Sequence, residues 1–205
     1  MTSRRGRVTV IAIAAVAVVV AGSLALLTGP ASTAERTVAD RRHDVWTWTP
    51  TTLGRGHFTA SGARVNVDLV GVAVHHLRRD VVVKASYADL RRVGPRFGLT
   101  VDLRTDRHQG RHVSLVAGRS DNWRGRTILL GSRRREVACV HRHTRVSYAR
   151  NAVWIVLPRR CLKNPRWVRF RVMAFKLVGE GRLQVDIAHR AGPTFRGWSR
   201  TVARR

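Results

Sequence analysis

The sequence predicts an all-β protein, an antiparallel β-sandwich of the jelly-roll or immunoglobulin-like type. Short valine-rich runs recur at intervals of about 8–14 residues and are separated by glycine, proline, asparagine and aspartate. Beyond residue 34, the only segment with helical character is the short stretch 88–95, which is too short for a stable helix. The fold class therefore follows from strand spacing and from the near absence of helical periodicity.

The N-terminal segment, residues 1–34, is predicted to be a signal peptide. Arg4, Arg5 and Arg7 form a basic start, residues 8–27 are apolar and uncharged, and small residues follow. The apolar run is also long enough to cross a bilayer as an uncleaved anchor helix, and this alternative stays open. Either outcome places the rest of the chain outside the cytoplasm.

The remainder is predicted to contain a single structural domain. Residues 35–62 are expected to form an exposed leader in which Trp46 and Trp48 start a short first strand. Residues 63–190 are expected to form the β-sandwich, and residues 191–205 a basic tail. This length suffices for one domain with a real core.

The strands of the first half follow from period-two alternation. In residues 63–77 the apolar phase switches at Gly71, which predicts a β-bulge in one long bent strand or a break between two. Residues 80–87 are expected to pair back with this segment as a hairpin. Further strands are expected over residues 97–103, 112–116, 126–130, 137–140 and 145–148.

The second half centres on residues 139–175. Residues 152–157 are apolar at every position, which predicts a central strand covered on both faces, and Pro158 ends it. Residues 167–172 alternate as a half-buried strand. Residues 182–188 are the last expected strand, in which Leu183, Val185 and Ile187 alternate with Gln184 and Asp186.

The two cysteines, Cys139 and Cys161, are predicted to form a disulfide because an exported chain folds in an oxidising compartment. The bridge would close a loop of about 23 residues and contribute about 3 kcal/mol in the chain-entropy model.

Net charge is the most extreme property of the chain, at +27. Loss of the signal segment removes three arginines and leaves +24. Such a charge predicts binding to anionic cell-wall or membrane-surface polymers, and no nucleic-acid-binding motif accompanies it. Only three of the 39 basic residues are lysine, so a coding bias toward arginine is the alternative origin of this charge.

Residues 157–169, Leu-Pro-Arg-Arg-Cys-Leu-Lys-Asn-Pro-Arg-Trp-Val-Arg, resemble a group of small exported actinobacterial proteins of uncharacterised function. Residues 87–90, Tyr-Ala-Asp-Leu, are similar to theirs as well. The resemblance extends over about residues 66–186 and implies a secreted β-sandwich with no known catalytic activity.

His141 and His143 are the best metal-binding candidates, because residues two apart on a strand project from the same face. A third ligand would have to come from His75, His76, His112 or His189. Surrounding arginines oppose cation binding, so no metal or other cofactor is predicted.

Carboxylates are scarce, and twelve occur in the whole chain. Asp102 with Asp106, or Asp121 with Asn122, could offer oxygen ligands to calcium, although no acidic calcium loop is present. Asp68, Asp80 and Asp186 are expected instead to pair with arginines.

The sequence favours a non-catalytic exported protein held on anionic envelope polymers by its charge. A carbohydrate-binding module is the alternative, in which exposed tryptophans stack on sugar rings; the candidates are Trp46, Trp48, Trp123 and Trp198. A secreted metal-dependent enzyme is the third hypothesis, but no nucleophile elbow or informative catalytic spacing supports it.

Overall fold

Two antiparallel sheets form the architecture of the chain. The computed structural model describes residues 34–51, 56–107, 110–119, 122–179, 181–188, 192–194 and 197–204. The predicted signal segment lies outside these residues, apart from Ala34. Within the described ranges, no helix has the length and apolar character needed to span a membrane.

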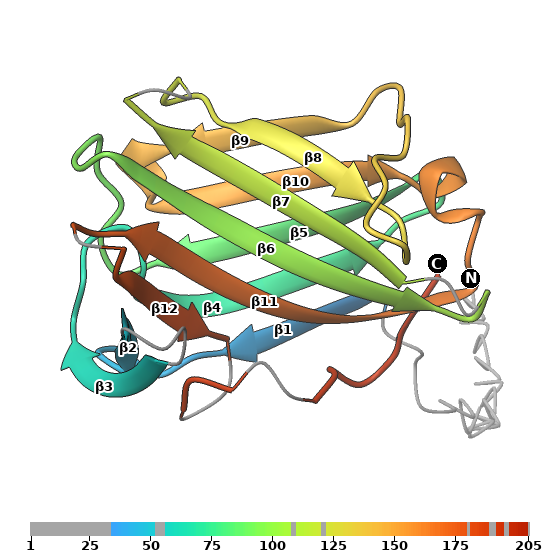
Figure 1. Cartoon of the computed structure of the whole chain (residues 1–205). Coiled ribbons are helices and arrows are strands. Elements are labelled where there is room, and N and C mark those ends of the chain that lie inside the picture. The colour runs from blue at the N-terminus through green and yellow to red at the C-terminus, as the bar shows by residue number, and fades with distance from the viewer. Residues whose placement is uncertain are drawn as a thin grey trace, which may run out of the picture. The chain divides into compact units, whose positions relative to one another are not determined.

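The first sheet has five strands in the order β1-β4-β5-β10-β9. Its strands are β1 Glu35–Ala39, β4 Leu69–His76, β5 Asp80–Tyr87, β10 Ala152–Pro158 and β9 His143–Ser147. The β4–β5 hairpin was predicted from the sequence and is confirmed. In Figure 1 this sheet lies behind the second one.

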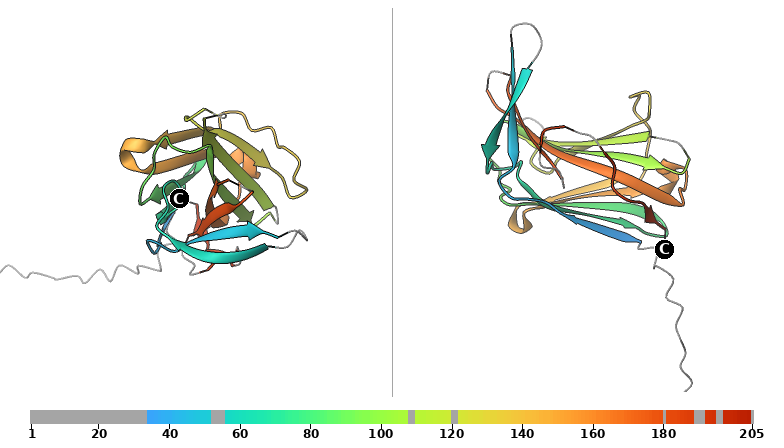
Figure 2. Two further views of the ribbon diagram at one scale, coloured as in Figure 1. Left: turned by 60° about the vertical axis from the view of Figure 1, so that its left-hand side comes forward. Right: turned by 90° about the horizontal axis from the view of Figure 1, so that it is seen from below.

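The second sheet has eight strands, seven of them in the order β3-β2-β12-β11-β6-β7-β8. These are β3 Gly56–Gly62, β2 Val45–Pro50, β12 Leu183–Ile187, β11 Trp167–Leu177, β6 Arg96–Thr105, β7 Gly110–Gly118 and β8 Arg126–Leu130. The short β13, Val202–Ala203, pairs with β11. Figure 2 shows the two sheets as layers; the β2–β3 hairpin, at one edge of the second sheet, extends beyond the other strands.

The core lies between these layers and is built from the alternating positions that the sequence predicts. On β6, Phe97, Leu99, Val101 and Leu103 are at most 1% exposed. The neighbouring β11 buries Val168, Phe170 and Val172, and the opposite sheet contributes Val74, Val83 and Ile155. Burial of apolar side chains at about 25 cal/mol per Å² is the main force that holds the two sheets together. The all-β fold and the antiparallel sheets are thus confirmed.

The predicted bulge is present in β4. The register of β4 against β5 shifts between Leu69 and Gly71, where the apolar phase of the sequence changes. A Cβ on Gly71 would lie 3.3 Å from the carbonyl oxygen of Val38 on the neighbouring β1, so glycine permits the close approach of that edge strand.

The short strand expected at Trp46 and Trp48 is present as β2, but the predicted leader and tail also contribute strands that the sequence did not predict. Residues 35–62 contain β1, β2 and β3, and residues 191–205 contain β13. β1 and β3 are edge strands whose side chains are largely exposed, so they carry little of the apolar alternation that marks a strand in a sequence.

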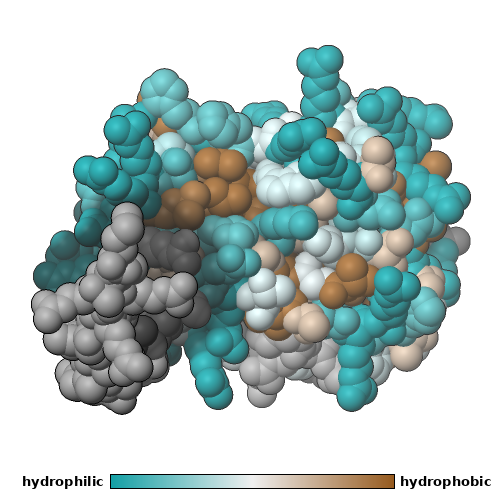
Figure 3. All heavy atoms as spheres, turned by 180° about the vertical axis from the view of Figure 1, so that it is seen from behind, coloured by the Kyte–Doolittle hydropathy of each residue, from teal (hydrophilic) through white to brown (hydrophobic). Residues whose placement is uncertain are grey.

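Two other local predictions differ from the structure. Residues 137–140 form no strand, although an isolated bridge joins Glu136 to Leu130, whereas residues 88–95 contain no helix, as their short length predicts. β10 is covered fully on only one face: Trp154 on its outer face is half-buried. Lys84 and Arg145 lie 5.8 Å and 5.7 Å from the centre of the Trp154 ring, so basic side chains cover this strand. Figure 3 shows hydrophilic side chains over much of the face seen from that side, with smaller apolar areas between them.

The predicted disulfide joins Cys139 to Cys161, with their Cα atoms 5.5 Å apart. It connects the loop that follows β8 to the 3₁₀ turn η2, Arg159–Leu162. A second 3₁₀ turn, η1 Tyr148–Arg150, precedes β10. The bridge is consistent with an extracellular protein.

Candidate functional site: an arginine-lined cleft

A cleft of about 530 Å³ opens at the end of the five-stranded sheet where β10 stops. Three segments meet there: the β4–β5 turn, the η2 turn and the loop after Cys139. The cleft is lined by Arg78, Arg79, Asp80, His141, His143, Pro158, Arg160 and Asn164. The lining therefore holds three arginines and two histidines against one carboxylate.

The first wall is the tight turn between β4 and β5. The amide of Leu77 donates to the carbonyl of Asp80 at 2.8 Å, and this bond closes the turn. Arg78 and Arg79 occupy the turn itself and are exposed. The short connection therefore brings two consecutive exposed arginines into the lining of the cleft.

The second wall is η2, which begins directly after Pro158 ends β10. Lys163 and Asn164 adopt left-handed backbone angles, with φ of 60° and 50°. The amide of Lys163 donates to the carbonyl of Arg160 at 3.0 Å, so the chain reverses within one turn. This reversal leaves the Arg160 side chain exposed beside Asn164.

Arg159 anchors the two walls to each other. Its side chain is buried, with 6% exposed, and its guanidinium donates to the carbonyls of Arg78 at 2.9 Å and Pro165 at 2.6 Å. Its backbone amide donates to the carbonyl of Arg79 at 2.8 Å. Burial, and then the charge of Arg204, lower the pKa of Arg159. A buried guanidinium held by carbonyls fixes both cleft walls from beneath.

His76 completes this anchor. It is fully buried, and its Nε2 accepts a hydrogen bond from Nε of Arg159 at 3.1 Å. Its Nδ1 lies 3.1 Å from the carbonyl oxygen of Val202, so the ring is neutral with the proton on Nδ1. Burial, together with the charge of Arg159, holds the pKa of His76 below its ordinary value. This histidine is structural.

The third wall is the loop that carries His141 and His143. The disulfide ties Cys139 of this loop to Cys161, the residue after Arg160. A guanidinium nitrogen of Arg160 lies 3.4 Å from the carbonyl of Val140, which it approaches as a donor. The crosslink therefore holds both histidines next to the arginines of η2.

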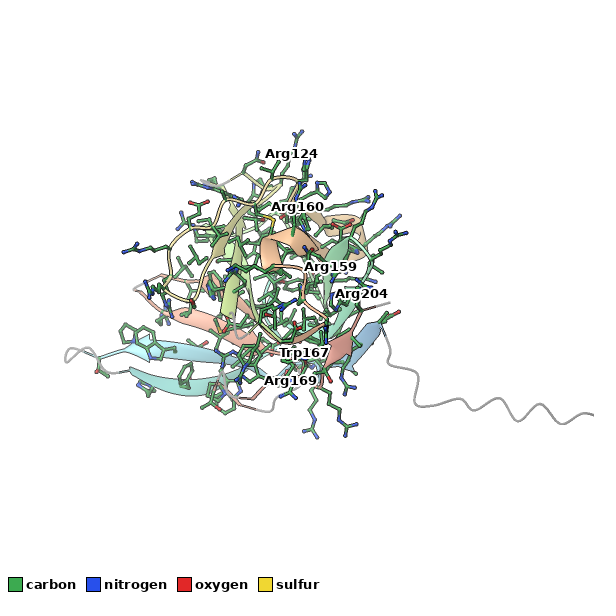
Figure 4. The ribbon with its side chains drawn as sticks, turned by 90° about the vertical axis from the view of Figure 1, so that its right-hand side faces the viewer. Arg124, Arg159, Arg160, Trp167, Arg169 and Arg204 are labelled. Carbon is green, nitrogen blue, oxygen red and sulfur yellow. A yellow bond between two sulfur atoms is a disulfide. The ribbon has the colours of Figure 1, made fainter. Side chains whose placement is uncertain are left out.

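The arrangement is suited to anions. Guanidinium groups present paired donors that match phosphate and carboxylate oxygens, and histidine can add a further donor. Figure 4 shows that the same side of the molecule also carries Arg204 and Arg169, with Arg159 lying inward between them and Arg160. A guanidinium carbon of Arg169 lies 5.6 Å from the centre of the Trp167 ring. Exposed positive charge thus continues beyond the cleft.

No family model, curated protein or solved structure matches this chain. The resemblance to exported actinobacterial proteins stays a prediction.

The histidine pair considered as a metal-binding candidate is not joined by a third ligand in the described structure. His141 and His143 both line the cleft, but none of the described candidates for a third ligand lines it with them. His75 faces Glu35 at 3.3 Å, His112 faces Asp102 at 2.7 Å, and His189 lies outside the described residues. In the part of the chain that the structure describes, no group of three metal-binding side chains includes His141 or His143. Adjacent arginines further disfavour a cation there.

The oxygen ligands first considered for calcium are used in other contacts. Asp102 accepts from the guanidinium of Arg171 at 2.7 Å and 2.9 Å and faces His112. Burial raises the pKa of Asp102, but the hydrogen bonds from His112 and Arg171 outweigh it and hold the pKa below its usual value. Asp106 accepts from the amide of Arg166 at 3.1 Å. Asn122 accepts from the amide of Arg124, and Asp121 lies outside the described residues.

The four tryptophans considered for sugar stacking are all half-buried. Trp46 and Trp48 lie on β2, and Trp123 meets Tyr148 edge to face at 6.3 Å. Trp198 lines a second cleft of about 440 Å³ with Asp102, His112 and Arg171. The guanidinium of Arg171 lies 4.8 Å from the centre of the Trp198 ring and occupies one of its faces.

Sequence reasoning missed the cleft arginines as a group. Arg78-Arg79 and Arg159-Arg160 are two of several Arg-Arg pairs in the chain, and nothing in their spacing brings them together. Their one distinguishing feature is position, since one pair follows a strand and the other begins after a strand-ending proline. Only the pairing of β10 with β5, which sets Pro158 opposite Asp80, makes them neighbours.

Proposed function

We propose that this chain is an exported, non-catalytic β-sandwich that binds anionic polymers of the cell envelope, with the arginine-lined cleft as its main contact. The observation that carries the proposal is the convergence of Arg78, Arg79 and Arg160 on one cleft, supported from beneath by a buried arginine. A fixed group of guanidinium donors recognises phosphate or carboxylate with more geometry than scattered surface charge can supply.

The surface around the cleft supports a polymer more than a small anion. Three further arginines are exposed on neighbouring segments: Arg166, Arg169 and Arg204. A polymer that is bound in the cleft and extends out of it would therefore meet further positive charge. Phosphate-rich or carboxylate-rich wall polymers and acidic lipid headgroups have this extended chemistry. Because most of these contacts are exposed, salt is expected to screen them strongly.

A carbohydrate-binding role has one observation in its favour, the presence of Trp198 in a cleft with Asp102 and His112. Polar side chains beside an aromatic ring are typical of sugar sites. Arg171 already covers one face of that ring, so the arginine-lined cleft is the better supported site.

A binding panel separates the two functions. The purified protein is titrated with polyphosphate, a carboxylate polymer, anionic lipid vesicles and neutral glycans, at about 0.1 M and about 0.5 M salt, over which the Debye length falls from about 10 Å to about half that. We expect binding to the polyanions at low salt and its loss at high salt. Retention of a neutral glycan at high salt, with no polyanion binding at low salt, would exclude the proposed function.

A further inference from the structure

Three aspartates from separate parts of the sequence converge at the opposite end of β4 from the arginine-lined cleft. Asp44 directly precedes β2, Asp68 directly precedes β4, and Asp186 lies on β12. One carboxylate oxygen from each lies within 4.8 Å of the others. β4 belongs to the five-stranded sheet, whereas β2 and β12 belong to the other, so the cluster lies where the two sheets adjoin (Figure 1).

The hydrogen bonds given to these carboxylates leave several oxygen atoms unused. Asp68 accepts from the amide of His43 through both oxygens at 3.1 Å, and Oδ2 of Asp186 accepts from the amide of Leu69 at 2.6 Å. Oδ1 of Asp186 and both oxygens of Asp44 are buried and have no hydrogen-bond partner among the described residues. Asp186 as a whole is 1% exposed.

Tyr87 adds an independent observation. It is the last residue of β5 and pairs with Leu69, the residue whose amide donates to Asp186. Its side chain is 3% exposed, and its hydroxyl has no hydrogen-bond partner in the described structure. Burial, and then the charge of Asp186, raise the pKa of Tyr87. The unpartnered Tyr87 hydroxyl therefore lies within electrostatic range of Asp186.

The described residues supply little countercharge to the cluster: burial raises the pKa of Asp44, and the charge of Arg41 only partly opposes that shift. Among the ion pairs between described residues, none involves Asp44, Asp68 or Asp186. The expectation that Asp68 and Asp186 pair with arginines is therefore not met. Burial of like charges without compensation costs several kcal/mol per ion, and in a chain with 39 basic and 12 acidic residues such a convergence of acids is unexpected.

We propose that Asp44, Asp68 and Asp186 form a binding site for one hard divalent cation of the calcium class, with the Tyr87 hydroxyl beside it. The donor set consists only of oxygen atoms, which calcium, magnesium and manganese prefer over zinc or copper. A bound cation would offset the repulsion between the carboxylates. It would also connect the segment before β4 to β2 and β12, so the two sheets would be crosslinked at this end.

The test uses the full-length chain, stripped of metal with EDTA and then titrated with calcium, magnesium or manganese. Calorimetry is expected to show one high-affinity ion per chain. At a calcium concentration about 100-fold above Kd, the melting temperature is expected to rise by about 5–10 °C relative to EDTA. The variants Asp44→Asn and Asp186→Asn should lose both signals, while Glu136→Gln, a change at an exposed carboxylate, should keep them.

The same variants show whether a lost signal reflects a lost site or a lost fold. Because each removes a repelling charge, both are expected to be at least as stable as the original chain in EDTA. If either variant fails to fold, the calorimetric stoichiometry of the unaltered chain decides alone. Absence of binding by all three ions at 10 mM would overturn the proposal and would mean that protons alone compensate the cluster.

Discussion

Replacing Arg78, Arg79 and Arg160 together by glutamine is expected to weaken polyphosphate binding about 100-fold at low salt. Each guanidinium–phosphate contact contributes about 1.5–3 kcal/mol, and 1.4 kcal/mol corresponds to a factor of ten, so the loss of two effective contacts suffices. All three side chains are exposed, so their substitution is not expected to change the stability of the fold. The affinity is measured by calorimetry or fluorescence titration.

A matched control separates the cleft from net charge. Arg119, Arg126 and Arg150 are also exposed and belong to segments at the opposite end of the strands (Figure 1). Their replacement by glutamine removes the same charge and is expected to reduce affinity by less than about 5-fold, since distant exposed charges are screened. Equal losses in the two triple variants would contradict the cleft as the main contact.

Replacing Arg159 by methionine is expected to lower the free energy of unfolding by about 3–5 kcal/mol. The change leaves three acceptors without this donor: the buried Nε2 of His76 and carbonyl of Pro165, and the partly buried carbonyl of Arg78. It also releases η2 from the β4–β5 turn. Urea denaturation measures the effect, and Arg160→Met, at the exposed neighbour, should stay within about 0.5 kcal/mol of the unaltered chain.

The same variant has a second readout in its pH dependence. The pKa of His76 lies below the value of about 6.5 for an unfolded histidine, chiefly through burial and partly through Arg159. The stability contributed by the neutral ring is therefore present above about pH 6.5 and is lost as the pH falls through the lower, folded-state pKa. Without the Arg159 charge that loss should be smaller. An unchanged pH profile, with no loss of stability at neutral pH, would show that Arg159 does not anchor the cleft.

Much of the fold could be predicted because its determinants are local. Alternation of apolar residues marks β6 and β11, and the phase change at Gly71 marks the bulge in β4. The predicted export of a chain with only two cysteines predicted the Cys139–Cys161 bridge. The edge strands β1 and β3 were not predicted, because the side chains of exposed strands do not alternate between apolar and polar.

The candidate sites could not be predicted, because they depend on which strands become neighbours. Asp186 alternates with Val185 and Ile187, and the sequence predicts that its carboxylate pairs with a neighbouring arginine. In the structure both faces at the end of β12 are covered, so Asp186 is as buried as its neighbours. His76 was also misjudged from the sequence. It was considered as a metal ligand, but in the structure it is buried and its Nε2 accepts a hydrogen bond from Arg159.

The central claim is that anionic polymers bind in the arginine-lined cleft, and the most direct measurement is a map of the contact. Backbone amide chemical shifts are followed by NMR while polyphosphate is added to the protein at low salt. The account predicts that the largest changes occur in three segments, residues 78–80, 139–143 and 159–164. Changes centred on Trp198, or spread evenly over the exposed arginines, would contradict it.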